Sequence, residues 1–494
     1  MSLPLKNHRF DLATIASWAM FSRGLEPEFS SAVHTQVEGL NSAPQEPHQD
    51  IRDLTALPWC SIDNDDSRDL DQLTVSEIHP NGKVRIYVAV ADVDAVVKKD
   101  SPIDQHARLN TTSVYTSARI FPMLPERLCT DLTSLNQDQV RLALIVEMDF
   151  RNDGVLLNSS IYRGRVLNKA QLAYDAVAAW IEGEADLPAA AQRIHGMAMQ
   201  ISTQDKLAQK LRKLRHAQGA LEFQTFQPRA QFENNRITDI TQQIQNRARQ
   251  LIEELMIATN GCTARFLAKH GVPAMRRVVR SPERWLSIVE VAQSYGETLP
   301  NEPDGKALEH FLAKQHKADP LRFPDLSLVI IKLMGSGEYI VERPRNEPIG
   351  HFGLAVQDYT HSTAPNRRFP DLITLRLIKS VLAGTGMPYS NAELDALAAH
   401  CTAQEDAAKK VERQLRKSEA ALLLHARIGQ RFNGVVTGVG VHGVWVRIFE
   451  PPAEGRLSGD LPELKVGLAV RVRLVSTSVE RGFIDFVMAH SVDH

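Results

Sequence analysis

Acidic side chains crowd one short stretch of the chain. Five aspartates lie between residues 61 and 73, directly after the apolar run at 57–60. Asp63, Asp69 and Asp71 are candidate ligands for a hard cation, because carboxylate oxygens are what Mg²⁺ or Mn²⁺ prefers. Like charges in one loop also raise its free energy unless a cation binds there. If Asp69 begins a strand, the alternation puts Asp69 and Asp71 on one face.

Two other interpretations of this stretch remain open. Segments rich in Asp, Asn and Ser are often solvated turns. An EF-hand loop is the second alternative, since Asp63, Asp65 and Ser67 fit its first three ligand positions. It is disfavoured because Arg68 stands where glycine is needed and Thr74 where glutamate is needed. The rest of the chain has to decide between a turn and a cation site.

Composition places the chain among ordinary globular proteins. Its 494 residues are enough for roughly three domains. Hydrophobic residues make up 43% and charged residues 23%, and no run of about 18 apolar residues predicts a membrane span. The N-terminus lacks the apolar core of a signal peptide. The four cysteines (Cys60, Cys129, Cys262, Cys401) are far apart, which disfavours zinc sites and disulfides and indicates a reducing cytoplasm.

The net charge is only −2, so information about partners must come from local patches. Basic residues concentrate at 206–215, 276–280, 367–368 and 409–417. Each stretch alone is typical of a solvated helix face. Four of them beside an acidic loop favour a polyanion held against a cation site.

The first half of the chain is predicted to combine helices with strands. Residues 12–21 and 30–40 have helical character, and 41–48 form a polar linker that contains proline. The clearest strands are residues 84–90, which follow an Asn-Gly turn, and residues 141–148.

Helices are predicted to dominate from about residue 170. An apolar stripe marks a helix from 251 to Gly271, and a second helix runs from Pro370 towards Gly384. A long charged helix is expected at 403–427. After Gly429 the chain becomes β-rich with glycines at the turns, which is typical of a five-stranded barrel of the OB-fold.

A series of sequence blocks follows in order between residues 53 and 380. They include Thr112-Ser-Val-Tyr115, Phe121-Pro-Met-Leu-Pro-Glu126, Asp131-Leu-Thr-Ser-Leu-Asn136, Gly219-Ala-Leu-Glu-Phe223, Leu251-Ile-Glu-Glu-Leu-Met256, His351-Phe-Gly-Leu-Ala355 and Tyr359-Thr-His-Ser-Thr-Ala-Pro-Asn-Arg-Arg-Phe-Pro-Asp371. With these blocks the chain resembles the RNase II/RNase R (RNB) family of 3′-to-5′ exoribonucleases. The acidic stretch matches the family motif I-D-x5-D-x-D-D at Asp63, Asp69 and Asp71.

The resemblance implies an α+β multidomain fold, with a mixed α/β catalytic domain of the RNB type followed by a small all-β OB-fold barrel. The domain boundaries that we expect are 1–50, 51–428 and 429–494. The first is a helical segment and linker, too short for the two cold-shock-type domains common in the family. A small helical module, helix-turn-helix-like, is one interpretation of it.

The resemblance also implies a metal-dependent exoribonuclease that hydrolyses single-stranded RNA to nucleoside 5′-monophosphates in the cytoplasm, as a monomer and with no membrane association. The cofactor would be Mg²⁺, with Mn²⁺ as an alternative. Its ligands would be Asp63, Asp69, Asp71 and Gln72. The catalytic residues would be Asp71, Asp69 and Arg367.

Four residues would contact the RNA substrate: Tyr115, Arg367, Arg368 and Trp445. Tyr115 would stack on the terminal nucleotide and Arg367 would contact the scissile phosphate. In the barrel, Phe432 and His442 could join Trp445 in a stacking surface, although strand alternation would bury some of these side chains in any case. The basic stretches 206–215 and 409–417 would follow the phosphate backbone.

One departure from the family motif leaves an alternative open. Gln72 replaces the last aspartate and offers a carbonyl oxygen without charge. Asp65 and Asp66 lie close enough in sequence to compensate. If they do not, the chain is an RNA-binding protein with an impaired site. A phosphodiesterase acting on short or non-RNA substrates is a third hypothesis.

Several other polar residues have both a structural and a functional interpretation. His351 and His361 lack the spacing of metal ligands, so structural roles are favoured. One of Glu253 and Glu254 is expected to be structural, the other a candidate for the rim of the site. Glu419 is a candidate contact near the exit of the catalytic channel.

Overall fold

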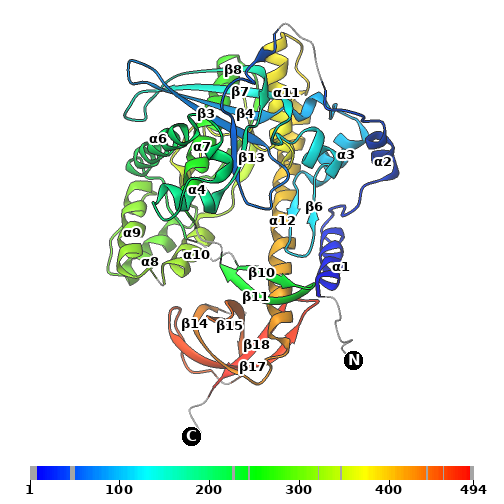
Figure 1. Cartoon of the computed structure of the whole chain (residues 1–494). Coiled ribbons are helices and arrows are strands. Elements are labelled where there is room, and N and C mark those ends of the chain that lie inside the picture. The colour runs from blue at the N-terminus through cyan, green and yellow to red at the C-terminus, as the bar shows by residue number, and fades with distance from the viewer. Residues whose placement is uncertain are drawn as a thin grey trace.

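The computed structural model describes residues 8–44, 50–224, 228–242, 245–320, 322–344, 348–440, 443–459 and 461–489. A large body contains a mixed β-sheet with helices packed around it, and one long helix leads from this body to a small barrel at the C-terminal end (Figure 1). The prediction of a mixed α/β domain followed by an all-β barrel is confirmed.

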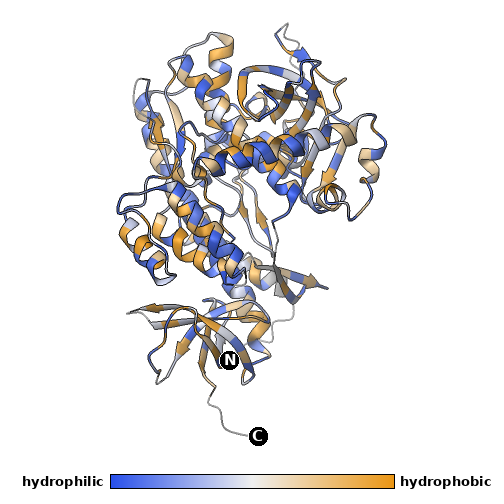
Figure 2. Ribbon diagram, turned by 90° about the vertical axis from the view of Figure 1, so that its left-hand side faces the viewer, coloured by the Kyte–Doolittle hydropathy of each residue, from blue (hydrophilic) through white to orange (hydrophobic). Residues whose placement is uncertain are grey.

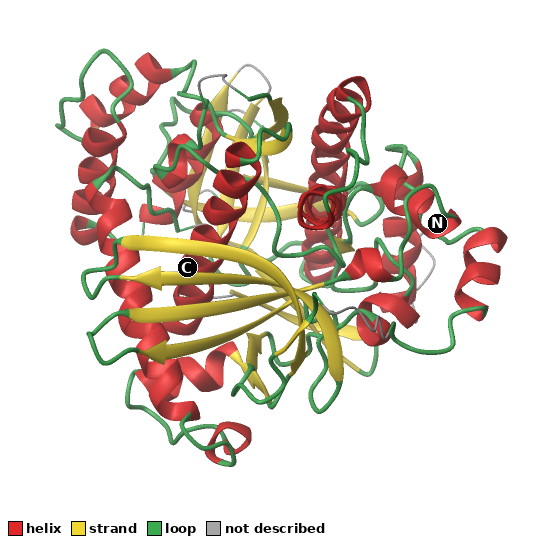
Figure 3. Cartoon of the chain, turned by 90° about the horizontal axis from the view of Figure 1, so that it is seen from above, coloured by secondary structure: helices red, strands yellow, loops and turns green. Residues whose placement is uncertain are grey.

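The central sheet has seven strands in the order β1-β8-β7-β4-β3-β2-β9. The β1–β8 and β2–β9 pairs are parallel and the others antiparallel. Seen from above, its long strands lie side by side with helices around them (Figure 3). The strands are β1 (Arg52–Asp53), β2 (Cys60–Asp63), β3 (Gln72–Ile78), β4 (Val84–Ala91), β7 (Val140–Phe150), β8 (Leu156–Leu167) and β9 (Ala170–Ala173).

Helices and small two-stranded antiparallel sheets complete the body. The helices are α1 (His8–Phe21), α2 (Ser31–Glu38), η1 (Val93–Ala95), α3 (Pro102–Asn110), η2 (Arg127–Leu132), α4 (Tyr174–Ile181), α5 (Ala189–Gln192), α6 (Met197–Ala217), α7 (Arg247–Lys269), α8 (Trp285–Ser294), α9 (Gly305–Ala318), α10 (Phe323–Met334), η3 (Phe352–Leu354), α11 (Phe369–Ala383) and α12 (Asn391–His425). The paired strands are β5 (Val114–Tyr115) with β6 (Ile120–Phe121), β10 (Pro228–Glu233) with β11 (Arg236–Gln242), and β12 (Ala274–Val278) with β13 (Glu338–Glu342).

The barrel is closed by five strands in the order β14-β15-β16-β18-β17. They are β14 (Arg431–Gly440), β15 (Gly443–Ile448), β16 (Ala453–Ser458), β17 (Ala469–Ser478) and β18 (Phe483–Met488). Hydrophobic and hydrophilic residues are interleaved along these strands (Figure 2). In β17, Val470, Val472 and Leu474 are buried while the residues between them are exposed, as expected when one face of a strand forms a core.

Most predicted elements lie where the sequence places them, with two differences. The long charged helix begins at Asn391 instead of residue 403, because Ser390 and Glu393 form a capping box there. The acidic residues do not begin a strand, since β3 starts at Gln72. Asp71 lies just before it, and its carbonyl still accepts a hydrogen bond from the Ala91 N–H at 2.9 Å.

The two N-terminal helices pack on different parts of the body. α1 lies against α12 and β11, whereas α2 lies against α3. Within the described residues all four cysteines are free and buried. No helix in the described ranges is both long and apolar enough to cross a membrane.

Buried ion pairs fix α11 to the sheet. The Arg376 guanidinium contacts Asp94 at 2.9 Å and Asp104 at 2.8 Å, and the Lys379 ammonium contacts Asp92 at 2.8 Å. Removing one partner of such a pair would leave an uncompensated buried charge, which costs about 3–5 kcal/mol. The middle of α11 is therefore held against α3 and against the segment that directly follows β4.

The hairpin β5–β6 is held by glutamates of α12. The Tyr115 N–H donates to Glu412 Oε1 at 3.2 Å, and the Ser117 hydroxyl donates to Glu419. Glu419 is 3% exposed, and this burial raises its pKa to about 7, against the opposing effects of Ser117 and Arg416. The folded protein therefore holds the Glu419 carboxyl partly neutral near physiological pH.

The raised pKa of Glu419 predicts a pH-dependent effect of Glu419→Gln. A carboxyl whose folded pKa lies above its unfolded value contributes most below the unfolded pKa, and this contribution is lost as pH rises through the folded pKa. The variant should therefore gain stability over the wild type at about pH 8, by at most about 3 kcal/mol, and little at about pH 5. Thermal unfolding at both pH values measures this; Glu463→Gln, at an exposed position in the barrel, is the control. An equal effect at both pH values would contradict the prediction.

Candidate active site

Two segments far apart in the sequence meet at Asp71. The first is the acidic loop, residues 63–71, and the second is the arginine turn, residues 364–368. The N–H of Asn366 donates to Asp71 Oδ1 at 2.9 Å, and Arg367 Nε lies 3.3 Å from Asp71 Oδ2. The fold thus brings a carboxylate and a guanidinium together across a separation of 296 residues.

Burial controls the protonation of Asp71. Its side chain is 2% exposed, and loss of hydration raises its pKa to about 7. The positive charge of Arg367 opposes this rise, the charge of Asp69 adds to it, and the Asn366 N–H opposes it. A carboxyl group with a pKa in this range can hold or release a proton near neutral pH.

Asp63 and Asp69 complete the acidic side of the site. Asp63 ends β2, and its Oδ1 accepts from the Asn64 N–H at 2.7 Å and the Ser67 hydroxyl at 3.1 Å. Burial raises the pKa of Asp63, with smaller opposing effects from Asn64 and Arg367. Asp69 accepts a hydrogen bond from the Tyr115 hydroxyl at 2.7 Å. All three carboxylates interact electrostatically with Arg367.

The solvated-turn interpretation applies to only part of the acidic stretch. Asp65 and Asp66 are exposed in a turn between Asp63 and Ser67. Asp69 is partly buried and Asp71 is buried. The stretch is therefore a surface turn at its tip and an electrostatic site at its two ends.

The oxygen chemistry of the acidic loop suits a hard divalent cation, although the loop does not form a closed cage. In the part of the chain that the structure describes, no three His, Cys, Asp or Glu side chains converge to hold a metal ion. Mg²⁺ is commonly bound by one or two carboxylates together with waters and substrate phosphates, so a complete cage is not required. Gln72 is half-buried at the start of β3, on the strand face that it shares with Thr74.

The two arginines of the turn differ in how accessible their guanidinium groups are to a substrate. The Arg367 side chain is 42% exposed and can reach a substrate while it contacts Asp71. Arg368 donates from Nη2 to Asp371 Oδ1 at 2.8 Å, and its side chain is 24% exposed. Arg367 is therefore the better placed of the two for a phosphate.

The aromatic candidates lie in two different places. Tyr115 is 39% exposed beside Asp69 and forms part of the acidic site. Trp445 lies in β15, on the strand face opposite Val446, in register with Gly438 and Arg456. A Cβ added at Gly438 would lie 3.6 Å from the Trp445 ring, so the indole covers this glycine on the barrel surface.

Of the other barrel candidates, Phe432 does not join Trp445 in a stacking surface. Phe432 is 8% exposed and packs edge-on against Phe486 inside the barrel, so of its two interpretations the structure supports a barrel-core residue. His442 lies outside the described residues. Strand alternation explains the result for Phe432, because its neighbours Arg431 and Asn433 are the exposed ones.

One basic stretch predicted as a surface patch is not a patch. Arg276 and Arg277 lie in β12, are 2% and 8% exposed, and pair with Glu342 and Glu405 at 2.8 Å each. Their charges are compensated inside the fold. In the stretch 409–417, Lys409 contacts Glu405 at 2.6 Å, so this charge is also partly compensated.

The histidines and glutamates singled out above have structural partners. His361 Nδ1 lies 2.8 Å from the Tyr339 hydroxyl, and burial holds its pKa well below the usual value. His351 Nδ1 accepts from the Leu354 N–H at 3.1 Å. Glu254 is buried and accepts from Arg215 Nε at 2.9 Å, so it is the structural member of the glutamate pair.

Sequence reasoning assigned no role to the polar residues behind the site. Thr133, Ser134 and Asn366 are 5%, 0% and 0% exposed, and all three hydrogen-bond to the acidic loop or the arginine turn. Their sequence signal is that they lie in two of the blocks that resemble the family, residues 131–136 and residues 359–371. Nothing in that signal says which distant residue each one contacts.

Comparison with known proteins agrees with this geometry. Residues 51–384 match the model of the RNB domain, and residues 430–489 match that of the RNase II-type exonuclease C-terminal S1 domain. The computed structure superimposes on Mycoplasma genitalium RNase R in complex with ribose-methylated single-stranded RNA with a TM-score of 0.88 at 21% identity, covering 97% of this chain and 78% of that one. It also superimposes on yeast Ssd1, described as a pseudonuclease, with a TM-score of 0.70 at 16% identity, covering 92% of this chain and 56% of that one.

Among curated proteins, Ribonuclease R of Escherichia coli is 31% identical over 498 aligned positions. The alignment covers 93% of this chain but 60% of the relative, so the chain spans well under two thirds of that protein's length. The RNB domain match alone covers more than half of the chain, and it contains both the acidic loop and the arginine turn. The chain therefore belongs to the RNB family, with a C-terminal S1 domain of the RNase II type.

Proposed function

We propose that this protein is a metal-dependent 3′-to-5′ exoribonuclease that hydrolyses single-stranded RNA to nucleoside 5′-monophosphates. The observation that carries the proposal is the contact between Asp71 and Arg367. A buried carboxylate that can exchange a proton and an exposed guanidinium that can hold a phosphate are placed side by side. Membership of the RNB family supplies the substrate class.

Arg367 is proposed to hold the scissile phosphate. A guanidinium can bind phosphate oxygens bidentately and neutralise the charge that grows during in-line attack. Asp71 would orient the attacking water and receive its proton. The Asn366 N–H remains bonded to Asp71 Oδ1 while Arg367 contacts the phosphate, so Asp71 stays oriented.

Asp63 and Asp69 are proposed to hold a divalent cation, Mg²⁺ or Mn²⁺, with Asp71 and the Gln72 carbonyl oxygen as further candidate ligands. The bound ion would lower the pKa of the attacking water and stabilise the phosphate charge. Asp63 and Asp71 suit such an ion because burial raises the pKa of both carboxyls when no cation compensates them.

Further RNA contacts are proposed both at the acidic site and outside it. Tyr115 would stack on the terminal nucleotide, since base–aromatic stacking is worth roughly 1–3 kcal/mol per base and tolerates any sequence. Trp445 and the basic residues of 206–215 and 409–417 would contact RNA outside the acidic site, with the exception of Arg215, which pairs with buried Glu254. The guanidinium of Arg368 is bonded to Asp371. Arg368 would therefore assist RNA binding indirectly, by holding the turn that carries Arg367. The protein is proposed to act as a cytoplasmic monomer.

Substitution Asp71→Asn provides the central test of the proposed chemistry. Asparagine keeps the shape but cannot take up a proton, so RNA cleavage should fall by about 10²–10⁴-fold while RNA binding stays within a few-fold. A 5′-labelled single-stranded RNA incubated with the protein and Mg²⁺ or Mn²⁺ should give a descending ladder with the wild type only. Asp65→Asn, an exposed carboxylate of the same loop, is the matched control and should cleave like the wild type.

Other outcomes would contradict the proposal in distinct ways. Salt-sensitive RNA binding with no ladder from the wild type would indicate an RNA-binding protein with an impaired site. Cleavage of short or DNA oligonucleotides only would indicate a different phosphodiesterase. An active Asp71→Asn variant would remove Asp71 from the chemistry.

Because residue 72 is a glutamine, we predict that Gln72→Asp tightens the binding of the divalent cation. A carboxylate adds charge to a site where the amide offers only one neutral oxygen. The Mg²⁺ or Mn²⁺ concentration that gives half-maximal cleavage should therefore fall, and direct Mn²⁺ titration should show tighter binding. An unchanged titration would count against Gln72 as a ligand.

A further inference from the structure

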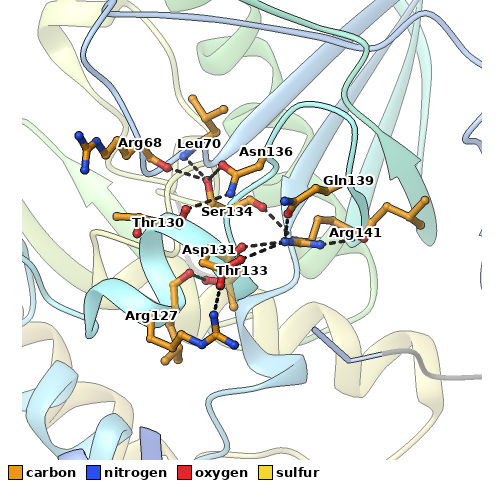
Figure 4. Close-up of polar contacts among 12 residues, drawn as sticks. Arg68, Leu70, Arg127, Thr130, Asp131, Thr133, Ser134, Asn136, Gln139 and Arg141 are labelled. Atoms are coloured by element: carbon orange, nitrogen blue, oxygen red, sulfur yellow. Dashed lines mark hydrogen bonds and ion pairs between the residues drawn. The ribbon is translucent and has the colours of Figure 1, made fainter. Parts of the chain in front are cut away.

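A buried polar segment links the acidic loop to the arginine turn. It consists of Thr133, Ser134 and Leu135, called here the bridging segment, and directly follows the single π-helical turn η2. Each of its residues is at most 5% exposed. Figure 4 shows Thr133 and Ser134 within a group of polar contacts that includes Arg68, Leu70 and Arg141. The Thr133 and Ser134 side chains themselves are buried behind the site, so they do not reach a substrate.

Ser134 and Leu135 hold the acidic loop. The Leu70 N–H donates to Ser134 Oγ at 2.9 Å, and Ser134 Oγ lies 2.8 Å from the Arg68 carbonyl, to which it can donate. The Leu135 N–H donates to the Leu70 carbonyl at 2.9 Å. Leu70 stands between Asp69 and Asp71, so these bonds fix the backbone from which both carboxylates project.

Thr133 holds the arginine turn. Its hydroxyl lies 2.5 Å from Asn366 Oδ1 and 2.9 Å from the Leu128 carbonyl and can donate to either, and the Asn366 backbone N–H donates to Asp71 Oδ1 at 2.9 Å. Asn366 is 0% exposed, and its Nδ2 is a buried atom for which the described residues provide no hydrogen-bond partner. The bond from Thr133 is therefore the tether of the Asn366 side chain.

The central sheet holds the bridging segment itself. Arg141, in β7, donates from Nε to the Ser134 carbonyl at 3.2 Å and from Nη2 to the Asp131 carbonyl at 3.0 Å. Asn168, just after β8, donates from Nδ2 to the Leu135 carbonyl at 2.9 Å. Polar contacts thus run from the sheet through three consecutive residues to both halves of the site.

We propose that Thr133 and Ser134 are positioning residues, which fix Asp69, Asp71 and Arg367 relative to one another without touching the substrate. This inference rests on the proposed function. In-line attack requires the reacting groups in one geometry, and a misplacement of about 1 Å can cost about 100-fold in rate. Residues that orient metal ligands typically change affinity or activity by about 10–100-fold when mutated.

Substitutions that remove one hydroxyl each test the inference in the full chain. Thr133→Val and Ser134→Ala should lower the single-turnover cleavage rate of labelled single-stranded RNA by about 10–100-fold, while RNA affinity in EDTA stays within about 3-fold. Thr133→Ser keeps the hydroxyl and should restore the rate to within about 3-fold of the wild type. Titration with Mn²⁺ alone, followed by electron paramagnetic resonance, should show about 10-fold or greater weakening for Ser134→Ala.

Thr130→Val is the matched control for loss of a threonine hydroxyl. Thr130 Oγ1 donates to the Glu126 carbonyl at 2.8 Å in the same π-helical turn but makes no side-chain contact with the site in the described structure. Its cleavage rate and Mn²⁺ affinity should equal those of the wild type. Ser134→Cys, nearly isosteric with serine, replaces Ser134→Ala if the alanine variant does not fold.

The possible outcomes separate this inference from the proposed function. Wild-type rates and Mn²⁺ affinity in Thr133→Val and Ser134→Ala would overturn the inference and leave the proposed function standing. A loss of activity that Thr133→Ser does not restore, and that follows the loss of folded protein, would show a structural role only and would also overturn it. If the wild type binds RNA and Mn²⁺ without cleaving, the proposed function fails, and the Mn²⁺ titration of the variants still decides the inference.

Discussion

The burial of the Asp71 carboxylate is the constraint on which the rest of the site depends. A carboxylate removed from water is destabilised unless positive charge or N–H donors replace the lost hydration. Here Arg367 and the N–H of Asn366 provide that replacement, and the pKa still rises to about 7. Because both partners come from the arginine turn, the acidic loop is complete only when that turn is in place.

Each segment that contributes to the site is held in place by a different element of the fold. The acidic loop leads into β3, the arginine turn leads into α11, and the hairpin of Tyr115 is held by α12. Ion pairs of Arg376 and Lys379 keep α11 against the sheet. α12 also packs against the barrel strands β17 and β18, so the helix that supports Tyr115 is the one that supports the S1 domain.

The sequence predicts those features that depend on local pattern. The strands β4 and β7 and the helices α7 and α11 are predicted by the spacing of apolar residues and by the residues that begin and end each element. The spacing of the aspartates indicates the acidic loop. The charges of Arg276 and Arg277 suggested a surface patch. Their acidic partners Glu342 and Glu405 lie 66 and 128 residues away in the chain, so no local sequence pattern could predict these ion pairs. The contact between Thr133 and Asn366 spans 233 residues and is hidden for the same reason.

The effect of Gln72 on cation binding depends on the groups around it. In this structure the three carboxylates of the site each already have a hydrogen-bond donor: Ser67 for Asp63, the Tyr115 hydroxyl for Asp69 and the arginine turn for Asp71. With one motif carboxylate replaced by an amide, fewer negative charges are available to attract an ion before substrate arrives. If the proposed function holds, the phosphate of the RNA must supply part of the charge and of the coordination sphere. Ion binding and RNA binding would then be coupled, because each completes the site that the other needs.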